Sequence, residues 1–346
     1  MKVVITGGFG FLGRLVGQSV LQRGLVGHSD GVEAVTELVL VDQAGAAPSG
    51  SLLALLDDVR VHAIEGDICD TDLLARALAN ATSVFHLASV VSAEAEVDFE
   101  KALRVNLDGS RAVLEACRTV SEMTGRKPRF VFPSSVAVFG SEEAAAGPVG
   151  DMVKHVPAST YGMTKAVNEL LVNDWTRRGW IDGRSARLPT VIIRPGKPNL
   201  AASSFASGLF REPLSGGEAV IPVTLETPMV VVGYRTAVAG LLALHDLDGS
   251  LLGLDRGVGL PALEVTVAEL VASVQDHTET TGRVLGPIRV KPDPSVMAIV
   301  ATWPGQWDSS RAHALGLPTA ASLSDIIDDF LTDFGPARDE RLAGAR

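Results

Sequence analysis

Short runs of aliphatic and β-branched residues alternate with helical repeats along the first half of the chain. A helix repeats its apolar positions every three or four residues, whereas a buried strand is a short continuous apolar run. This pattern predicts a series of alternating strands and helices. The predicted strands are residues 3–6, 38–41, 59–64, 83–87, 129–132 and 191–194, and the predicted helices are residues 14–23, 73–79, 103–122 and 161–175.

The pattern changes after Arg194, where residues 195–228 are rich in Pro, Ser and Gly. Such composition is typical of loops with short elements. A second loop-rich stretch covers residues 249–261. Further elements are expected on both sides of it: helices at residues 234–247, 268–275 and 324–334, and a strand at residues 288–291.

Strands that alternate with helices are typical of β-α-β units, whose crossovers are right-handed. We therefore predict an α/β fold, a Rossmann-type doubly wound parallel sheet with a smaller mixed C-terminal domain. Residues 1–195 and about 231–250 are assigned to the sheet domain. Residues of about 196–230 and 251–336 are assigned to the smaller portion.

Composition narrows the partners of this 346-residue chain. Its formal charge is −11 and it has no long basic run, which argues against nucleic acid. Cys69 and Cys117 lie in apolar or helical surroundings, as free thiols of a reducing compartment do. No secretory signal is apparent, and the apolar stretch at residues 237–244 is too short to span a bilayer. We expect a cytoplasmic protein without a membrane partner.

A glycine-rich segment, Gly7-Gly8-Phe9-Gly10-Phe11-Leu12-Gly13, lies between the first predicted strand and helix. In that setting backbone N–H groups and the helix N-terminus face a pyrophosphate, although a glycine-rich turn without a ligand is the alternative. Asp42 ends the second strand, where a carboxylate binds both ribose hydroxyls and repels a 2′-phosphate. It lies farther along than the usual ~20 residues, which we attribute to an insertion at residues 24–37. This predicts NAD rather than NADP, unless Asp42 is an ordinary turn residue.

Tyr161 and Lys165 form the second candidate group. A phenol has a reference pKa of about 10 and is a weak base at neutral pH. A lysine four residues later lies on the same helical face, so its charge can stabilise the phenolate. The pair then exchanges a proton with a substrate hydroxyl.

Several segments in this order resemble the extended short-chain dehydrogenase/reductase superfamily, also described as NAD-dependent epimerases/dehydratases. They cover about residues 2 to 200 and comprise residues 6–13, 85–88, 106–110, 133–140, 161–165 and 194–196. The resemblance implies a catalytic set of Ser135, Tyr161 and Lys165. In it Tyr161 is the acid/base, Lys165 binds the nicotinamide ribose and lowers the pKa of Tyr161, and Ser135 hydrogen-bonds the reacting oxygen.

The resemblance also implies a set of residues that bind NAD. They are Gly7, Phe9, Gly10, Phe11, Leu12, Gly13, Asp42, Asp67, Ile68, Leu87, Ala88, Ser89, Asn106, Tyr161, Lys165 and Pro195. Asp67 and Ile68 follow the third strand, where a pair that contacts adenine is expected, although Asp67 alone is equally a helix cap. Structural roles for Ser135 and Asn106 remain open, and His86 is expected to serve the core.

Departures from the family pattern narrow the chemistry. Dehydratases of this superfamily carry an Asp-Glu pair directly after the active-site hydroxyl, whereas this chain has Val136 and Ala137, which argues against dehydration. Phe139 stands where many relatives have tyrosine.

A closer resemblance is to the D-erythronate dehydrogenases, carried by residues 90–96, 187–199, 201–205 and 211–214. It implies NAD-dependent oxidation of D-erythronate at C2 to the 2-oxo acid (2-dehydro-D-erythronate).

A small polyhydroxy acid needs a cation for its carboxylate and several polar partners. The expected substrate-binding residues are Ser92, Ser135, Tyr161, Lys197, Asn199, Ser204 and Arg235, although each loop residue among them has an ordinary surface role as its alternative. No metal is expected. By family analogy we expect a homodimer formed through the helices at residues 103–122 and 161–175.

Two rival functions remain open on these residues. An NAD-retaining nucleotide-sugar epimerase would return hydride to its substrate and release no NADH. A dinucleotide-binding regulator without turnover would need none of the residues Ser135, Tyr161 and Lys165. Their presence therefore argues against a regulator.

Overall fold

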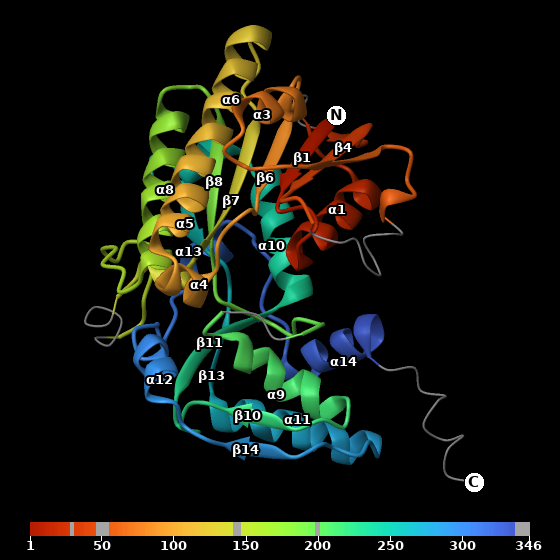
Figure 1. Ribbon diagram of the computed structural model, residues 1–346, viewed down its shortest axis with the longest axis vertical. Helices are drawn as coiled ribbons and strands as arrows, with labels where there is room; N and C mark the ends of the chain where they lie inside the picture. Colours follow the sequence, from red (N-terminus) through yellow and green to blue (C-terminus); the bar gives the residue numbers. More distant parts are fainter. Residues whose placement is uncertain (28–30, 46–54, 141–146, 198–200, 336–346) are drawn as a thin grey trace.

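The computed structural model describes residues 1–27, 31–45, 55–140, 147–197 and 201–335. Figure 1 shows a larger part built on a parallel sheet, with the N-terminus at one end of it. A smaller part, with short sheets and helices, lies below the carboxyl ends of the sheet strands in this view.

Within the described residues, the main sheet has seven strands in the order β12-β8-β7-β6-β1-β4-β5, and every neighbouring pair is parallel. The strands are β1 (Lys2–Thr6), β4 (Glu37–Asp42), β5 (Val61–Glu65), β6 (Ser83–His86), β7 (Arg129–Ser135), β8 (Asp182–Leu188) and β12 (Gly257–Gly259). The strand order reverses at β1 and β6. Such a switch point is where open α/β sheets bind ligands. The predicted Rossmann-type sheet is confirmed.

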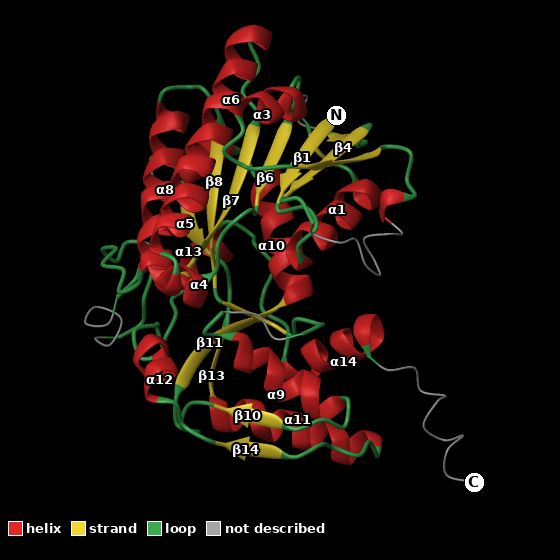
Figure 2. Cartoon of the chain, viewed as in Figure 1, coloured by secondary structure: helices red, strands yellow, loops and turns green. Residues whose placement is uncertain are grey.

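Helices cover both faces of this sheet (Figure 2). Adjacent residues of a strand point to opposite faces, and β1 follows this rule: Ile5 packs in one core cluster and Val4 in the other. Helices α1 (Phe11–Arg23) and α10 (Tyr234–Asp246) share the cluster of Ile5. The cluster of Val4 includes α3 (Thr71–Leu78), α6 (Ser110–Thr124) and α8 (Thr160–Arg177).

The predicted helix at residues 103–122 is not regular. Helix α5 (Phe99–Leu103) continues into a π-helical turn (Arg104–Gly109), and α6 follows. Helix α4 (Ser92–Val97) precedes them. Single π-helical turns are rare and frequently lie at functional sites.

Residues 191–194 were predicted to form the sixth strand of the main sheet, and this was wrong. Strand β9 (Thr190–Ile192) pairs instead with β11 (Pro228–Gly233), which pairs with β13 (Leu263–Thr266) in a separate sheet. The sixth position belongs to β8, whose apolar run is broken by Arg184 and Arg187. Both are buried because their charges are satisfied: Arg184 donates to backbone carbonyls and Arg187 pairs with Glu169.

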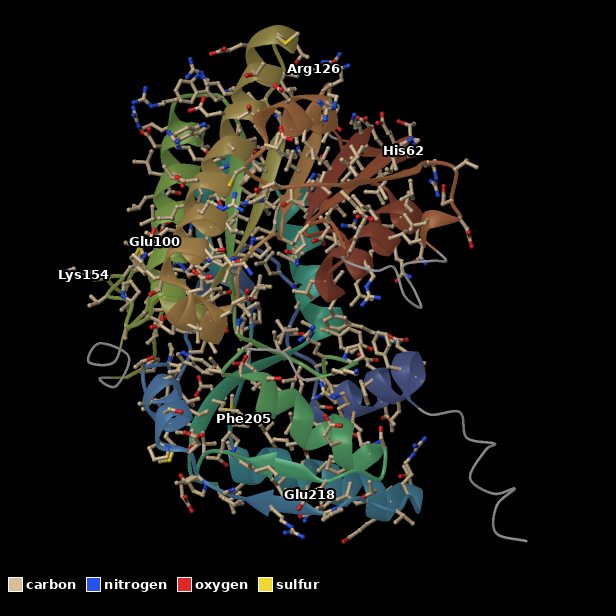
Figure 3. All side chains as sticks on the ribbon, in the orientation of Figure 1. His62, Glu100, Arg126, Lys154, Phe205 and Glu218 are labelled. Carbon is tan, nitrogen blue, oxygen red and sulfur yellow. The ribbon has the colours of Figure 1, made fainter. Side chains whose placement is uncertain are left out.

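The smaller part has a core of its own, which includes Phe210, Tyr234 and Ile326. Phe205 of α9 and Glu218 are labelled on it in Figure 3. Its further elements are α9 (Ser204–Leu214), β10 (Ala219–Ile221), α11 (Val267–Thr281), β14 (Ile288–Val290), α12 (Pro294–Val300) and α14 (Leu323–Phe334). The remaining short elements are β2 (Leu25–Val26) and β3 (Val32–Glu33) in the insertion, 3₁₀ turns at Val136–Val138 and Gly249–Leu252, and α13 (Ser310–Ala314).

Candidate active site

A crevice runs along the carboxyl ends of β1, β6 and β7. It consists of two cavities, of about 360 Å³ and 460 Å³, which share Gly7, Gly10, Leu87 and Ser89. The 460 Å³ cavity also reaches Asp42, Asp67, Ile68 and Ala88. The 360 Å³ cavity reaches Ser135, Tyr161 and Lys165. The two groups of residues predicted from the sequence thus lie at opposite ends of one crevice.

The glycine loop is held too tightly for side chains. Gly7 has φ +70°, and a Cβ at Gly13 would lie 2.3 Å from the Gly7 carbonyl oxygen. The Phe9 N–H donates a 2.9 Å hydrogen bond to the Asp42 carboxylate, which ties the loop to the end of β4. Close backbone packing of this kind leaves room for a pyrophosphate at the N-terminus of α1. The loop therefore fits a dinucleotide.

The far end of the crevice fits an unphosphorylated ribose. Asp42 borders it, and the two cations nearby are committed to other carboxylates. Arg104 pairs with Asp67 at 2.6 Å, and Lys101 pairs with Glu94 at 2.6 Å. The Asp42 carboxylate would repel a 2′-phosphate, and both neighbouring cations are already paired. This supports the preference for NAD that the sequence predicts.

Ser135, Tyr161 and Lys165 are brought together at the other end. Ser135 ends β7 and hydrogen-bonds the Tyr161 phenol. Lys165 lies one turn beyond Tyr161 on α8, with its Nζ 5.4 Å from the centre of the Tyr161 ring. The same Nζ donates a 2.8 Å hydrogen bond to the Pro133 carbonyl. This arrangement places a hydroxyl, a phenol and an ammonium around one point, as proton transfer to or from an alcohol requires.

Burial dominates the protonation of this group. It raises the pKa of Tyr161 to about 12, against the opposing effect of the Ser135 hydrogen bond. Burial also lowers the pKa of Lys165 to about 7, against the opposing charge of Glu169. The sequence predicts that Lys165 lowers the pKa of Tyr161, whereas in the protein alone burial raises it and the opposing effect comes from Ser135.

Asn106 has a structural position beside the site. It lies in the π-helical turn, where its side-chain oxygen accepts from the Val90 N–H at 2.7 Å and its amide donates to the Thr164 hydroxyl at 3.2 Å. It does not line either cavity. Asn106 therefore fixes the loop after β6 against α8, the helix that carries Tyr161.

The predicted cofactor-binding residues divide into those that line the crevice and those that do not. Most line the crevice, whereas Phe9 contributes its backbone N–H to Asp42, and Pro195 is not among the lining residues. The neighbour of Pro195, Arg194, lines the cavity instead.

Only part of the predicted substrate-binding set reaches the 360 Å³ cavity. Ser92 lines it and accepts a 3.2 Å hydrogen bond from the Ala202 N–H, so it joins the start of α4 to the segment before α9. Lys197 is exposed and Ser204 begins α9, and neither lines the cavity. Asn199 lies outside the described residues.

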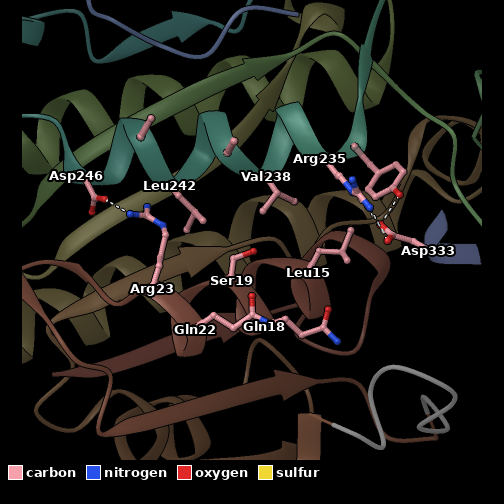
Figure 4. Close-up of a pocket in the computed structure, with 13 residues that line it drawn as sticks. Leu15, Gln18, Ser19, Gln22, Arg23, Arg235, Val238, Leu242, Asp246 and Asp333 are labelled. Carbon is pink, nitrogen blue, oxygen red and sulfur yellow. Dashed lines mark hydrogen bonds and ion pairs between the residues drawn. The ribbon is translucent and has the colours of Figure 1, made fainter. Parts of the chain in front are cut away.

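Arg235 does not belong to this cavity, contrary to its prediction as a carboxylate ligand. It pairs with Asp329 at 2.5 Å and with Asp333 at 2.6 Å. Figure 4 shows it on α10, in a separate groove of about 730 Å³ between α10 and α1. Its charge is therefore already neutralised by α14, away from Tyr161.

Sequence reasoning missed several residues that line the cavity. Arg194 follows β9, Thr190 lies in β9, and Ile299 and Trp303 come from the α12 region. Arg194 was visible at the end of a predicted strand. Ile299 and Trp303 lie more than 130 residues beyond Tyr161 in a segment without a motif, so no sequence signal placed them here.

The described residues contain neither a membrane-spanning helix nor a metal-binding cluster of side chains. None of their helices is long and apolar enough to cross a membrane. No group of three or more His, Cys, Asp and Glu side chains among them is arranged to hold a metal ion.

The sequence model of the NAD dependent epimerase/dehydratase family matches residues 3–232. The chain belongs to this family. The predicted superfamily and its NAD cofactor are thereby confirmed, and the match covers the glycine loop, Asp42, Ser135, Tyr161 and Lys165.

Individual relatives extend the likeness to nearly the whole chain. A D-erythronate dehydrogenase from Cupriavidus necator is 44% identical over 339 residues, 98% of this chain and 100% of that protein. A D-erythronate dehydrogenase from Haemophilus influenzae is 37% identical over 333 residues, 96% of this chain and 99% of that protein. The crystal structure of a nucleoside-diphosphate-sugar epimerase from Agrobacterium tumefaciens has 35% identity and a TM-score of 0.82, and the match covers 96% of this chain and 94% of that one.

Proposed function

We propose that this protein oxidises D-erythronate, a four-carbon sugar acid, to the 2-oxo acid with NAD. The observation that carries the proposal is the 44% identity to the D-erythronate dehydrogenase of Cupriavidus necator, which extends over 98% of the chain. The grouping of Ser135, Tyr161 and Lys165 at one end of the crevice supports it, because oxidation of a secondary alcohol needs a proton acceptor beside the hydroxyl.

The size of the cavity favours a small substrate. Its volume of about 360 Å³ is at the lower end of the range for ligand pockets. The same cavity includes Gly10, Leu12 and Gly13 of the cofactor loop, so the nicotinamide end of NAD must share it. Little space then remains for a nucleotide sugar.

Each residue of the catalytic group has a separate task in this proposal. Ser135 and Tyr161 hold the C2 hydroxyl oxygen, and Tyr161 accepts its proton. Lys165 is held by its hydrogen bond to the Pro133 carbonyl. Its charge stabilises the Tyr161 phenolate, which is the base. Bound NAD would supply the acceptor for the hydride that leaves C2.

A nucleotide-sugar epimerase is the second candidate, favoured by the 35% identity to the Agrobacterium tumefaciens structure that carries this description. Epimerisation uses the same Tyr161 and Lys165 but returns the hydride to the substrate. The two functions therefore differ in whether NADH accumulates.

The test is to mix the purified protein with NAD and follow NADH absorbance with four-carbon sugar acids and, in parallel, with nucleotide sugars. Accumulation of NADH with D-erythronate is the expected result. If no acid gives NADH and a nucleotide sugar is interconverted, the protein is an epimerase instead.

We further propose a homodimer in a cytoplasmic setting. The helices on one face of the sheet carry exposed apolar side chains: Val97 at the end of α4, Phe99 in α5, Met123 in α6 and Leu170 in α8. Burying them against a second copy is favourable. Cys69 and Cys117 are free thiols, as is typical of a reducing compartment. A Leu170→Lys variant that sediments as the same species as the parent would argue against this dimer.

A further inference from the structure

We propose that Arg194 binds the carboxylate of the substrate and so makes the enzyme specific for acids. The inference rests on the proposed function, which supplies an anionic substrate. It also replaces Lys197 and Arg235, the two cations that the sequence suggested for this task.

Arg194 and Lys165 are the two cationic side chains among the described residues that line the 360 Å³ cavity. Lys165 is engaged at the Pro133 carbonyl beside Tyr161. A carboxylate next to C2 therefore has Arg194 as its cationic partner in the cavity. The planar guanidinium suits this task because it donates two parallel hydrogen bonds to one carboxylate.

The backbone of Arg194 is held firmly while its guanidinium has no partner among the described residues. The Arg194 N–H donates to the Ser207 hydroxyl at 3.0 Å, and its carbonyl accepts from Arg211 at 2.9 Å. Other buried arginines are neutralised, as Arg187 is by Glu169. A half-buried guanidinium without a counter-charge is costly unless it has a ligand.

The charges around Arg194 add to this cost. Burial is the main cause that lowers its pKa, and the neighbouring cations Arg211 and Arg14 lower it further. Arg211 pairs with Glu212, and Arg14 donates to the Gly10 carbonyl at the start of α1. An anion bound to Arg194 would offset these neighbouring positive charges.

The test compares Arg194→Gln and Arg194→Lys with the parent and with Arg289→Gln. Arg289 is an exposed arginine of β14 that pairs with Glu218, so its loss removes one charge far from the cavity. For Arg194→Gln we expect kcat/KM for D-erythronate to fall roughly 10- to 100-fold, the loss expected for a hydrogen bond to a charged group. The fall should lie mainly in KM, with the Kd for NAD unchanged. Arg194→Lys should recover part of it, and Arg289→Gln should match the parent.

Two results would overturn the inference. An equal KM for D-erythronate in Arg194→Gln would remove its role in substrate binding. A weaker Kd for NAD with an unchanged KM for the acid would assign Arg194 to the pyrophosphate. If Arg194→Gln does not fold, Arg194→Lys carries the same comparison, since a point charge without the planar fork should still raise KM.

Failure of the proposed function is distinguishable from failure of this inference. If the parent protein oxidises no sugar acid, binding of D-erythronate to the NADH-loaded protein is measured by calorimetry. Binding that Arg194→Gln loses and Arg289→Gln keeps would support the inference without turnover. Absence of binding to the parent, or equal binding to all variants, would overturn it.

Discussion

The Ser134 hydroxyl donates a 2.5 Å hydrogen bond to the carboxylate of Glu169, a residue only 2% exposed. Ser134 precedes Ser135 in β7, and Glu169 follows Lys165 by one turn of α8. The other oxygen of the carboxylate pairs with Arg187 of β8 at 2.8 Å. This buried carboxylate therefore links the strand and the helix that carry the three catalytic candidates.

We expect Glu169→Gln to destabilise the protein by about 3 kcal/mol, the lower end of the cost of breaking a buried ion pair. The variant leaves the Arg187 guanidinium, 1% exposed, with Asp151 at 3.1 Å and the more distant Asp255 at 3.8 Å as its carboxylate partners among the described residues. Urea unfolding at neutral pH measures the loss. Glu115→Gln is the control, because Glu115 forms an exposed pair with Arg118 that is worth little. Equal stability of the two variants would contradict the structural role of Glu169.

We expect Tyr161→Phe to lose roughly 100- to 10,000-fold in kcat, the usual contribution of a general acid–base group. Its Kd for NAD should stay within a few-fold of the parent, since the glycine loop and Asp42 are untouched. The control is Tyr234→Phe, the other of the two tyrosines in the chain. Tyr234 donates to Asp333 outside the active-site cavity, so its variant should keep turnover. Loss of NAD binding in Tyr161→Phe would show that its role is different.

Asp42→Asn should reduce the preference for NAD over NADP by roughly 10-fold or more, because it removes the charge that repels a 2′-phosphate. The asparagine still offers an oxygen to the Phe9 N–H, so the glycine loop should keep its position. Steady-state kcat/KM with each cofactor measures the change. An unaltered ratio would mean that other residues select the cofactor.

Local signals predicted the parts of this site that one segment builds by itself. The glycine loop, Asp42 at a strand end, and Tyr161 with Lys165 on one helical face each follow from spacing within a few residues. Their placement along the carboxyl ends of a parallel sheet followed from the β-α-β pattern. These elements lie where the sequence indicated.

Long-range pairing accounts for the misses. Strand β8 was not predicted because Arg184 and Arg187 interrupt its apolar run, and their burial depends on partners distant in sequence, such as Glu169 of α8 and the Leu244 carbonyl of α10. Arg235 was a plausible carboxylate ligand until α14 supplied Asp329 and Asp333. Trp303 reaches the cavity from the α12 region, through packing that no local spacing encodes.

His86 should make the fold sensitive to acid. Burial, and to a lesser extent the Lys165 charge, lower the pKa of His86 to about 3. Its Nδ1 lies 2.6 Å from the Thr6 hydroxyl and its Nε2 2.8 Å from that of Ser110. Because Ser110 donates to the Asn106 carbonyl, His86 donates through Nε2 and its Nδ1 accepts, which is the neutral ring.

The sign of the effect follows from this lowered pKa. Between pH 6.5 and 3 the unfolded chain binds a proton at His86 that the folded chain does not, so the stability present above pH 6.5 is lost as the pH falls. From pH 7.5 to 5 we expect a loss of about 2 kcal/mol from this residue. Urea unfolding of the parent and of His86→Asn at both pH values isolates it, since the asparagine does not titrate. His62, exposed on β5, gives the matched variant His62→Asn, which should keep the slope of the parent. Equal slopes for all three proteins would mean that His86 is protonated in the folded state.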